Sequence, residues 1–286
     1  MNVSRTTPSA PSPLRAALDQ RIEAGELELP LLPHVASQVL AACSDEACDA
    51  RRLTELIHND QALAAHVLRV SNSPLYCPRE PIVSLQQAVA RLGFGNICKI
   101  AIAVAVQGRI FGAPGHEALV RALWSHAVAA GAYAQEIARL RRRNVEGAFL
   151  CGLLHDIGRP VILQSMLDLA RQEGVEAGEP ELLEAMDALH AAVGVHLIET
   201  WGFPDWMQAA ARHHHDPEAA GEHVELARTT GFADLLSHWA LDEELDAGGA
   251  PHGHPLLAAL ELYADQLTDL LEQRARVLET VEAFRG

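Results

Sequence analysis

The sequence predicts an all-α protein folded as two helical lobes. Apolar residues make up 49% of the chain and aromatic residues only 5%. An Ala- and Leu-rich composition of this kind favours helices over strands. Segments with helical periodicity follow one another along the chain, and we find no alternating pattern of a half-buried strand and no internal repeat. The two lobes are expected to divide near residue 113.

The first lobe is predicted to occupy residues 14–113, after a Ser/Thr/Pro-rich segment, 1–13, that we expect to be disordered. Asp60 is a predicted N-cap for a helix that runs to about Ser71. Ser84 and Gln87 predict a capping box for a second helix, and Gly93 its end. Two Gly residues and a Pro in "FGAPGH" (111–116) then predict the linker.

The second lobe is predicted to occupy residues 114–286. Asn144 is expected to cap the helix that carries "AFLCGLLHD", and Pro160 to lie in the first turn of the next. The most regular helical period recurs through 180–200. A Gly/Pro/His-rich loop (247–255) precedes a final amphipathic helix. The remaining helices are expected at about 117–142, 204–214 and 222–241.

The charge of the chain argues against nucleic acid and anionic membranes as partners. Its formal net charge is -16, so phosphate backbones repel it, and the basic cluster at 139–144 is too short to reverse this. The N-terminus has no apolar region typical of a secretory signal, and the longest apolar run (100–106) is too short to span a bilayer. We therefore expect a cytoplasmic protein.

The cysteines predict free thiols in a reducing compartment. Their number, five, is odd, and no CxxC spacing occurs among them. We therefore expect no disulfide framework from Cys43, Cys48, Cys77, Cys98 and Cys151.

Several ionisable residues are placed where helices should bury their side chains. His126 and His190 have apolar neighbours at helical offsets, and His155 and Asp156 lie in an apolar stretch. One inward histidine is ordinarily satisfied by a backbone carbonyl, but a buried unpaired carboxylate is costly. "RHHHDP" (212–217) adds three histidines, which could also form a solvated turn, and Asp234 is a further inward carboxylate. Converging imidazoles and carboxylates predict a divalent metal site.

These motifs together resemble the HDOD family, the HD-related output domain of the HD superfamily of metal-dependent phosphohydrolases. The resemblance covers about residues 25–240 and includes "LPLLPHVASQVL", "LTELIHNDQALAAHVLRVSNSPLY", "LWSHAVAAGAYA" and "AFLCGLLHDIG". It implies a helical first lobe followed by an HD-type helical bundle. The metal ligands that it implies are His126, His155, Asp156, His190, His214, His215 and Asp234, with His213 a weaker candidate.

The resemblance also bears on function. HDOD domains commonly resemble HD domains that have lost ligands, and the implied role is bacterial signalling through protein partners. Here every ligand position holds a competent residue. Active relatives of the HD-GYP group carry Lys where this chain has Arg159, and a GYP motif that is missing here. Cyclic-di-GMP hydrolysis is therefore not expected.

Two functions remain open at this stage. The first is a regulatory output protein with a retained metal site, for which 82–95 is the first surface to consider for a signalling partner. The second is a metal-dependent phosphohydrolase acting on a nucleotide or another phosphoester, with Asp156 and Arg159 in its active site. A site of purely structural role is the third reading. His/Asp ligation suits one or two ions of Fe, Mn, Zn or Ni.

Overall fold

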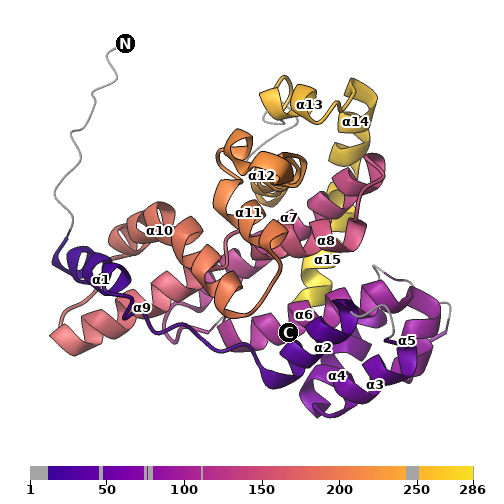
Figure 1. Ribbon diagram of the computed structural model, residues 1–286, viewed down its shortest axis with the longest axis horizontal. Helices are drawn as coiled ribbons and strands as arrows, with labels where there is room; N and C mark the ends of the chain where they lie inside the picture. The colour runs from indigo at the N-terminus through magenta and orange to yellow at the C-terminus, as the bar shows by residue number, and fades with distance from the viewer. Residues whose placement is uncertain are drawn as a thin grey trace.

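The computed structural model describes residues 12–44, 48–73, 76, 80–110, 112–242 and 251–285. The regular elements in these ranges are all helical, which confirms the predicted all-α class (Figure 1). Residues 1–11 of the predicted disordered segment and residues 247–250 of the predicted loop 247–255 lie outside the described residues. The rest of that loop is described, and Pro255 at its end already begins a helix. Ser12 and Pro13 are described: Ser12 caps the first helix and Pro13 begins it.

The first lobe is a small bundle, and two of its helices begin at the predicted caps. The Asp60 carboxylate accepts a hydrogen bond from the amide of Leu63 (3.0 Å), and Ser84 accepts one from Gln87 (3.2 Å). Gln87 does not complete the predicted capping box, because its side chain accepts from Val83 and not from Ser84. The helices of this lobe are α2 (His34–Ser44), α3 (Ala50–His58), α4 (Gln61–Ser71), α5 (Leu85–Leu92) and α6 (Phe94–Ile110).

The chain before α2 lies along the second lobe. Helix α1 (Pro13–Glu23) packs against α9 (Gly158–Glu173), where Arg21 donates to the Gln172 side chain (2.6 Å). The indole of Trp201 donates to the Pro30 carbonyl (2.8 Å). The chain before α2 therefore lies beside the second bundle, although it precedes the predicted boundary near residue 113.

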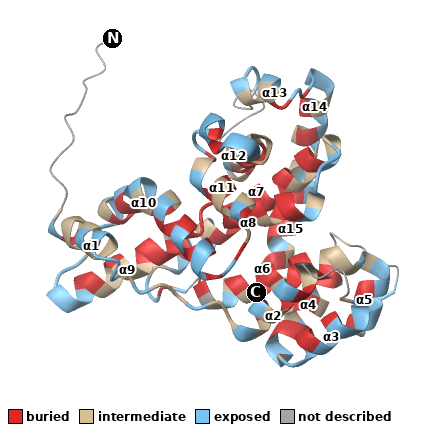
Figure 2. Ribbon diagram, viewed as in Figure 1, coloured by how far each residue is buried: buried red, intermediate tan, exposed pale blue. Residues whose placement is uncertain are grey.

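The second lobe is built around the long helix α7, whose central residues are buried (Figure 2). Helix α8 packs closely along it because Gly152 permits the approach: a Cβ there would lie 2.5 Å from the Ala130 carbonyl oxygen. Asn144 caps α8 as predicted, accepting from Gly147 (2.9 Å). The further helices are α7 (Glu117–Leu140), α8 (Val145–Leu154), α10 (Glu179–Thr200), α11 (Asp205–His213), the 3₁₀ helix η1 (Pro217–His223) and α12 (Val224–Leu241).

The predicted single C-terminal helix is wrong, because the chain bends twice. It forms α13 (Pro255–Ala259), α14 (Ala264–Glu272) and α15 (Arg274–Phe284). Glu261 takes a positive φ of 51°, which ends α13, and the Gln266 side chain accepts from the amide of Tyr263 at the start of α14. Apolar periodicity continues across these short caps and so conceals them. None of the described helices is long and apolar enough to cross a membrane.

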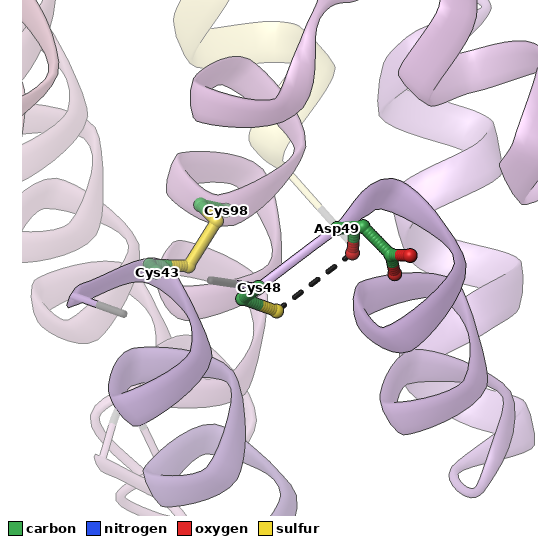
Figure 3. The surroundings of a disulfide bond; sticks show 4 residues. All are labelled: Cys43, Cys48, Asp49 and Cys98. Atoms are coloured by element: carbon green, nitrogen blue, oxygen red, sulfur yellow. Dashed lines mark hydrogen bonds between the residues drawn. A yellow bond between two sulfur atoms is a disulfide. The ribbon is translucent and has the colours of Figure 1, made fainter. Parts of the chain in front are cut away.

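The expectation that the cysteines stay free is also wrong. Cys43 at the end of α2 and Cys98 on α6 form a disulfide across the first lobe (Figure 3). Cys48 lies nearby, with its Sγ 3.7 Å from the Asp49 carbonyl oxygen, and Cys151 is a buried free thiol. The pairing joins residues 55 apart in sequence, and neither their spacing nor their odd number revealed it.

Removing this bond should destabilise the first lobe. Cys98→Ser is expected to lower the free energy of unfolding by about 2–4 kcal/mol, because the unfolded chain regains the freedom of a long closed loop. Urea denaturation without reductant measures the loss. Cys48→Ser, which leaves the disulfide intact, should change stability by less than about 0.5 kcal/mol. Equal stability of Cys98→Ser and the unaltered protein would contradict the assignment.

Candidate metal centre

The structure brings together all seven predicted ligand residues. His126 comes from α7, His190 from α10 and Asp234 from α12, and each lies on the face that its helix turns inward. His155 and Asp156 directly follow α8, where the chain turns into α9. His214 and His215 directly follow α11. All are buried or partly buried except His215, which is exposed.

One group of ligand atoms lies around Asp234. The Nε2 atom of His126 is 3.1 Å from Oδ1 of Asp234 and 3.4 Å from Nε2 of His155. His155 Nε2 is 3.5 Å from the same Asp234 oxygen. The Oδ2 atom of Asp156 lies 3.7 Å from His126 Nε2 and 3.6 Å from His155 Nε2.

A second group lies on the other side of Asp156. Its Oδ1 atom is 3.3 Å from Nε2 of His190 and 3.6 Å from Nε2 of His214. His190 Nε2 is in turn 3.4 Å from His214 Nε2 and 3.0 Å from His215 Nε2. Asp156 therefore turns one carboxylate oxygen to each group.

The histidines are held so that Nε2 offers its lone pair to the centre. The Nδ1 atoms of His155, His190 and His214 lie 2.7, 3.0 and 2.9 Å from the carbonyl oxygens of residues 152, 186 and 211. A carbonyl can only accept, so each Nδ1 carries the proton. In the neutral ring the Nε2 atom is then the free base. This is the arrangement by which proteins orient histidine ligands.

Ser237 fixes the tautomer of His126 in the same way. Its hydroxyl donates to the Asp234 carbonyl (2.7 Å) and lies 3.0 Å from Nδ1 of His126. Because the hydroxyl proton is already used, Ser237 accepts from His126 Nδ1, which leaves Nε2 unprotonated.

Ser237→Ala should therefore weaken metal binding without removing a ligand. We expect a loss of roughly tenfold, within the range typical of partners that orient a ligand. Competition with a chromophoric chelator measures it. Ser165→Ala is the matched control, since Ser165 also donates to the carbonyl four residues earlier (2.9 Å) but on α9, outside the cluster. Equal affinities in both variants would contradict the role of Ser237.

The charges at the centre favour a bound cation. Burial works to raise the pKa of Asp156, but the positive charges of His155 and Arg159 outweigh it and lower that pKa below its usual range. Burial also works to raise the pKa of Asp234, but the neighbouring histidines His126, His155 and His238 lower it below its usual range. Both carboxylates are thus ionised, and Arg159 supplies a permanent positive charge beside Asp156.

The protonation of the histidines differs across the cluster. Burial lowers the pKa of His214 to about 3, so this ring is neutral at pH 7. Burial would also lower the pKa of His155, but the neighbouring carboxylates of Asp156 and Asp234 raise it to about 9. A metal ion that binds at neutral pH must displace the proton from His155.

These residues fit a divalent transition metal. Ions of this class hold His and carboxylate ligands at about 2.0–2.2 Å, which places neighbouring ligand atoms roughly 3–3.5 Å apart. The distances in both groups are close to this. Oδ1 of Asp156 is buried and accepts no hydrogen bond from any described residue. Without a cation, Nε2 lone pairs and carboxylate oxygens would face one another at these separations.

Arg159 does not project into solvent and is already engaged. Its Nε donates to Oδ2 of Asp156 (2.5 Å), and its Nη1 donates to Oδ1 of Asp187 (2.6 Å). The guanidinium is therefore held at the edge of the cluster, in contact with the carboxylate of Asp156, which faces both groups. A phosphate could reach it only in competition with these two aspartates.

Two residues of the centre were not predicted from the sequence. His238 lies one helical turn after Asp234, 3.4 Å from its Oδ1, and Ser237 orients His126. An i, i+4 spacing from Asp234 was the available signal for His238. His213, the weaker candidate, is in none of the groups of ligand atoms that lie close enough to hold an ion.

Comparison with known proteins places the chain in a family. The HDOD domain family model matches residues 29–217, about two thirds of the chain. The chain belongs to the HDOD family.

Solved structures share the fold. An HDOD domain protein of unknown function from Geobacter sulfurreducens is similar with a TM-score of 0.71 and 24% identity, covering 94% of this chain and 97% of that chain. A candidate metal-dependent phosphohydrolase from Shewanella amazonensis has a TM-score of 0.72 at 19% identity, covering 95% and 98%. A candidate signal transduction protein from Marinobacter aquaeolei has 0.68 at 20%, covering 95% and 66%. At these identities the likeness shows the fold alone.

A curated relative extends beyond the matched region. An uncharacterized protein from Treponema pallidum is 25% identical over 262 residues, which cover 88% of this chain. The chain spans about half the length of that relative, 49%.

Proposed function

We propose that this HDOD protein is a bacterial signal-transduction protein whose second lobe holds one or two divalent transition-metal ions. The observation that carries the metal site is the convergence of five histidines and two aspartates with their ligand atoms 3.0–3.7 Å apart. The regulatory role is supported by membership of a family whose implied function is signalling through protein partners. Asp156 is the central ligand, since one of its oxygens faces each half of the cluster.

The partner in this proposal is another signalling protein. The segment 82–95 remains our candidate surface for it, and Val83 at its start is a large apolar residue that is 73% exposed. A cytoplasmic location fits the same role and is part of the proposal.

A phosphohydrolase is the second candidate, and the bridging position of Asp156 favours it. A pair of ions, when bound, would supply an activated water and a clamp for the phosphate. Asp156 would then hold both ions, and Arg159 would lie close enough to contact a phosphate at the edge of the site. The Asp156 and Asp187 contacts of Arg159 oppose this reading, because they already occupy its guanidinium.

A screen of phosphoesters separates the two candidates. Protein loaded with Mn or Fe is assayed against nucleotides and a chromogenic phosphodiester, beside Asp156→Asn protein treated identically. The regulatory proposal expects bound metal and no hydrolysis above the Asp156→Asn control. Metal-dependent hydrolysis that disappears in Asp156→Asn would establish the enzyme instead, and metal-free protein would contradict both.

A further inference from the structure

A second candidate site lies where the two lobes meet, away from the metal centre. It is a cavity of about 280 Å³ bounded by α5 and α6 of the first lobe and by α7, α8 and α15 of the second. Figure 1 shows α15 descending from the second lobe toward α6 at this junction. The side chains that matter for its chemistry are Arg91, Lys99, Gln135, Arg139, Phe149 and Arg276.

Lys99 is the unusual residue of this cavity. It is only 4% exposed, and lysines are almost never buried without a counter-charge. Its ammonium donates to the side chain of Gln135, a neutral partner, and lies 4.7 Å from the centre of the Phe149 ring. No carboxylate of the described residues is within ion-pair distance of it. Burial lowers the pKa of Lys99 to about 8, so most of the charge persists at pH 7.

The arginines leave a second positive charge unbalanced. Arg139 is paired with Glu136, and Arg91 lies 3.6 Å from a carboxylate oxygen of Glu80. The guanidinium of Arg276 is exposed and forms no hydrogen bond or ion pair within the part of the chain that the structure describes. Lys99 and Arg276 therefore line the cavity as two cations that have no carboxylate at ion-pair distance among the described residues. Glu146 and Glu136 act on Lys99 only from farther away, and the net charge of the whole protein is -16.

We propose that this interlobe cavity binds a small molecule that carries a phosphate monoester. A phosphate monoester has about two negative charges at pH 7, which match the two unbalanced cations. A carboxylate would neutralise only one of them. Because Lys99 belongs to α6 and Arg276 to α15, the bound phosphate would join the first lobe to the C-terminal helix of the chain. The proposal does not depend on the metal centre or on its function.

Calorimetric titration of the full chain tests the proposal, with inorganic phosphate, ribose 5-phosphate and AMP as probes and acetate as the carboxylate comparison. At least one phosphorylated probe should bind with a stoichiometry of one. Lys99→Met and Arg276→Gln should each weaken that binding at least about tenfold, as expected for charge-assisted hydrogen bonds. Arg121→Gln, an exposed arginine of α7 outside the cavity, should leave it unchanged.

The same titration on Asp156→Asn separates this site from the metal centre, because binding in the cavity should persist there. The proposal is overturned if no phosphorylated probe binds at millimolar concentration, or if acetate binds more tightly than all of them. It is also overturned if binding disappears in Asp156→Asn, or survives unchanged in both Lys99→Met and Arg276→Gln. Since Arg276 is exposed, Arg276→Gln remains informative should Lys99→Met fail to fold.

Discussion

Asp156→Ala is expected to leave the purified protein without bound transition metal, whereas the unaltered chain holds one or two ions. Asp156 turns one oxygen to the His126–His155 group and the other to the His190–His214 group, so its removal takes a ligand from both. A loss of affinity of at least roughly a hundredfold should follow, beyond the range seen for residues that only orient a ligand. Elemental analysis after gel filtration measures the metal content.

Asp187→Ala is the matched control for this variant. It removes the same charge and also breaks an ion pair with Arg159, but Asp187 lies outside the cluster and its side chain is 69% exposed. Metal content should therefore stay at the level of the unaltered protein. If Asp156→Ala retained its metal, or if both variants lost it equally, the assignment of Asp156 as the shared ligand would be wrong.

Gly158→Ala is expected to lower the free energy of unfolding by about 3 kcal/mol or more, at the upper end of overpacking effects. A Cβ at this position would lie 2.1 Å from the carbonyl oxygen of His190 and 2.8 Å from the amide nitrogen of Gly194. Both are backbone atoms of α10, so α9 and α10 would have to separate. This separation would also displace His190, and we expect weaker metal binding as well. Urea denaturation followed by circular dichroism measures the stability.

Gly108→Ala provides the opposite case for the same substitution. Gly108 lies in α6, and a Cβ there would meet no atom within 4 Å. Because alanine favours a helix over glycine, the variant should be more stable by roughly 0.5–1 kcal/mol. The free energy of unfolding of the two variants is compared. If Gly158→Ala lowered it by no more than Gly108→Ala raised it, the close approach of α9 and α10 would not be needed for stability.

Local signals predicted much of the fold. Asp60, Ser84 and Asn144 cap the helices expected of them, because a cap depends on a side chain and an amide three residues later. The end of the chain was predicted less well. There the helix is interrupted by a positive φ at Glu261, a residue with no intrinsic preference for that conformation, and the apolar pattern continues across the break.

The candidate site was predicted as a set of residues and not as a geometry. Inward placement of His126 and Asp234 followed from helical periodicity, but the two-sided position of Asp156 depends on how α8, α10 and α12 pack. Ser237 was missed because it is not a ligand itself: it acts only by accepting a hydrogen bond from Nδ1 of His126. The Cys43–Cys98 bond was missed for a related reason, since only the packing of α2 on α6 brings the two sulfurs together.

The ligands of the metal centre come from segments spread over 108 residues of sequence, from His126 to Asp234. A metal site that uses both groups would act as a cross-link among α7, α8, α10, α11 and α12. Its binding energy would then add to the stability of the whole second lobe, in proportion to the logarithm of the free metal concentration. The free energy of unfolding of the second lobe would thereby report the concentration of available metal.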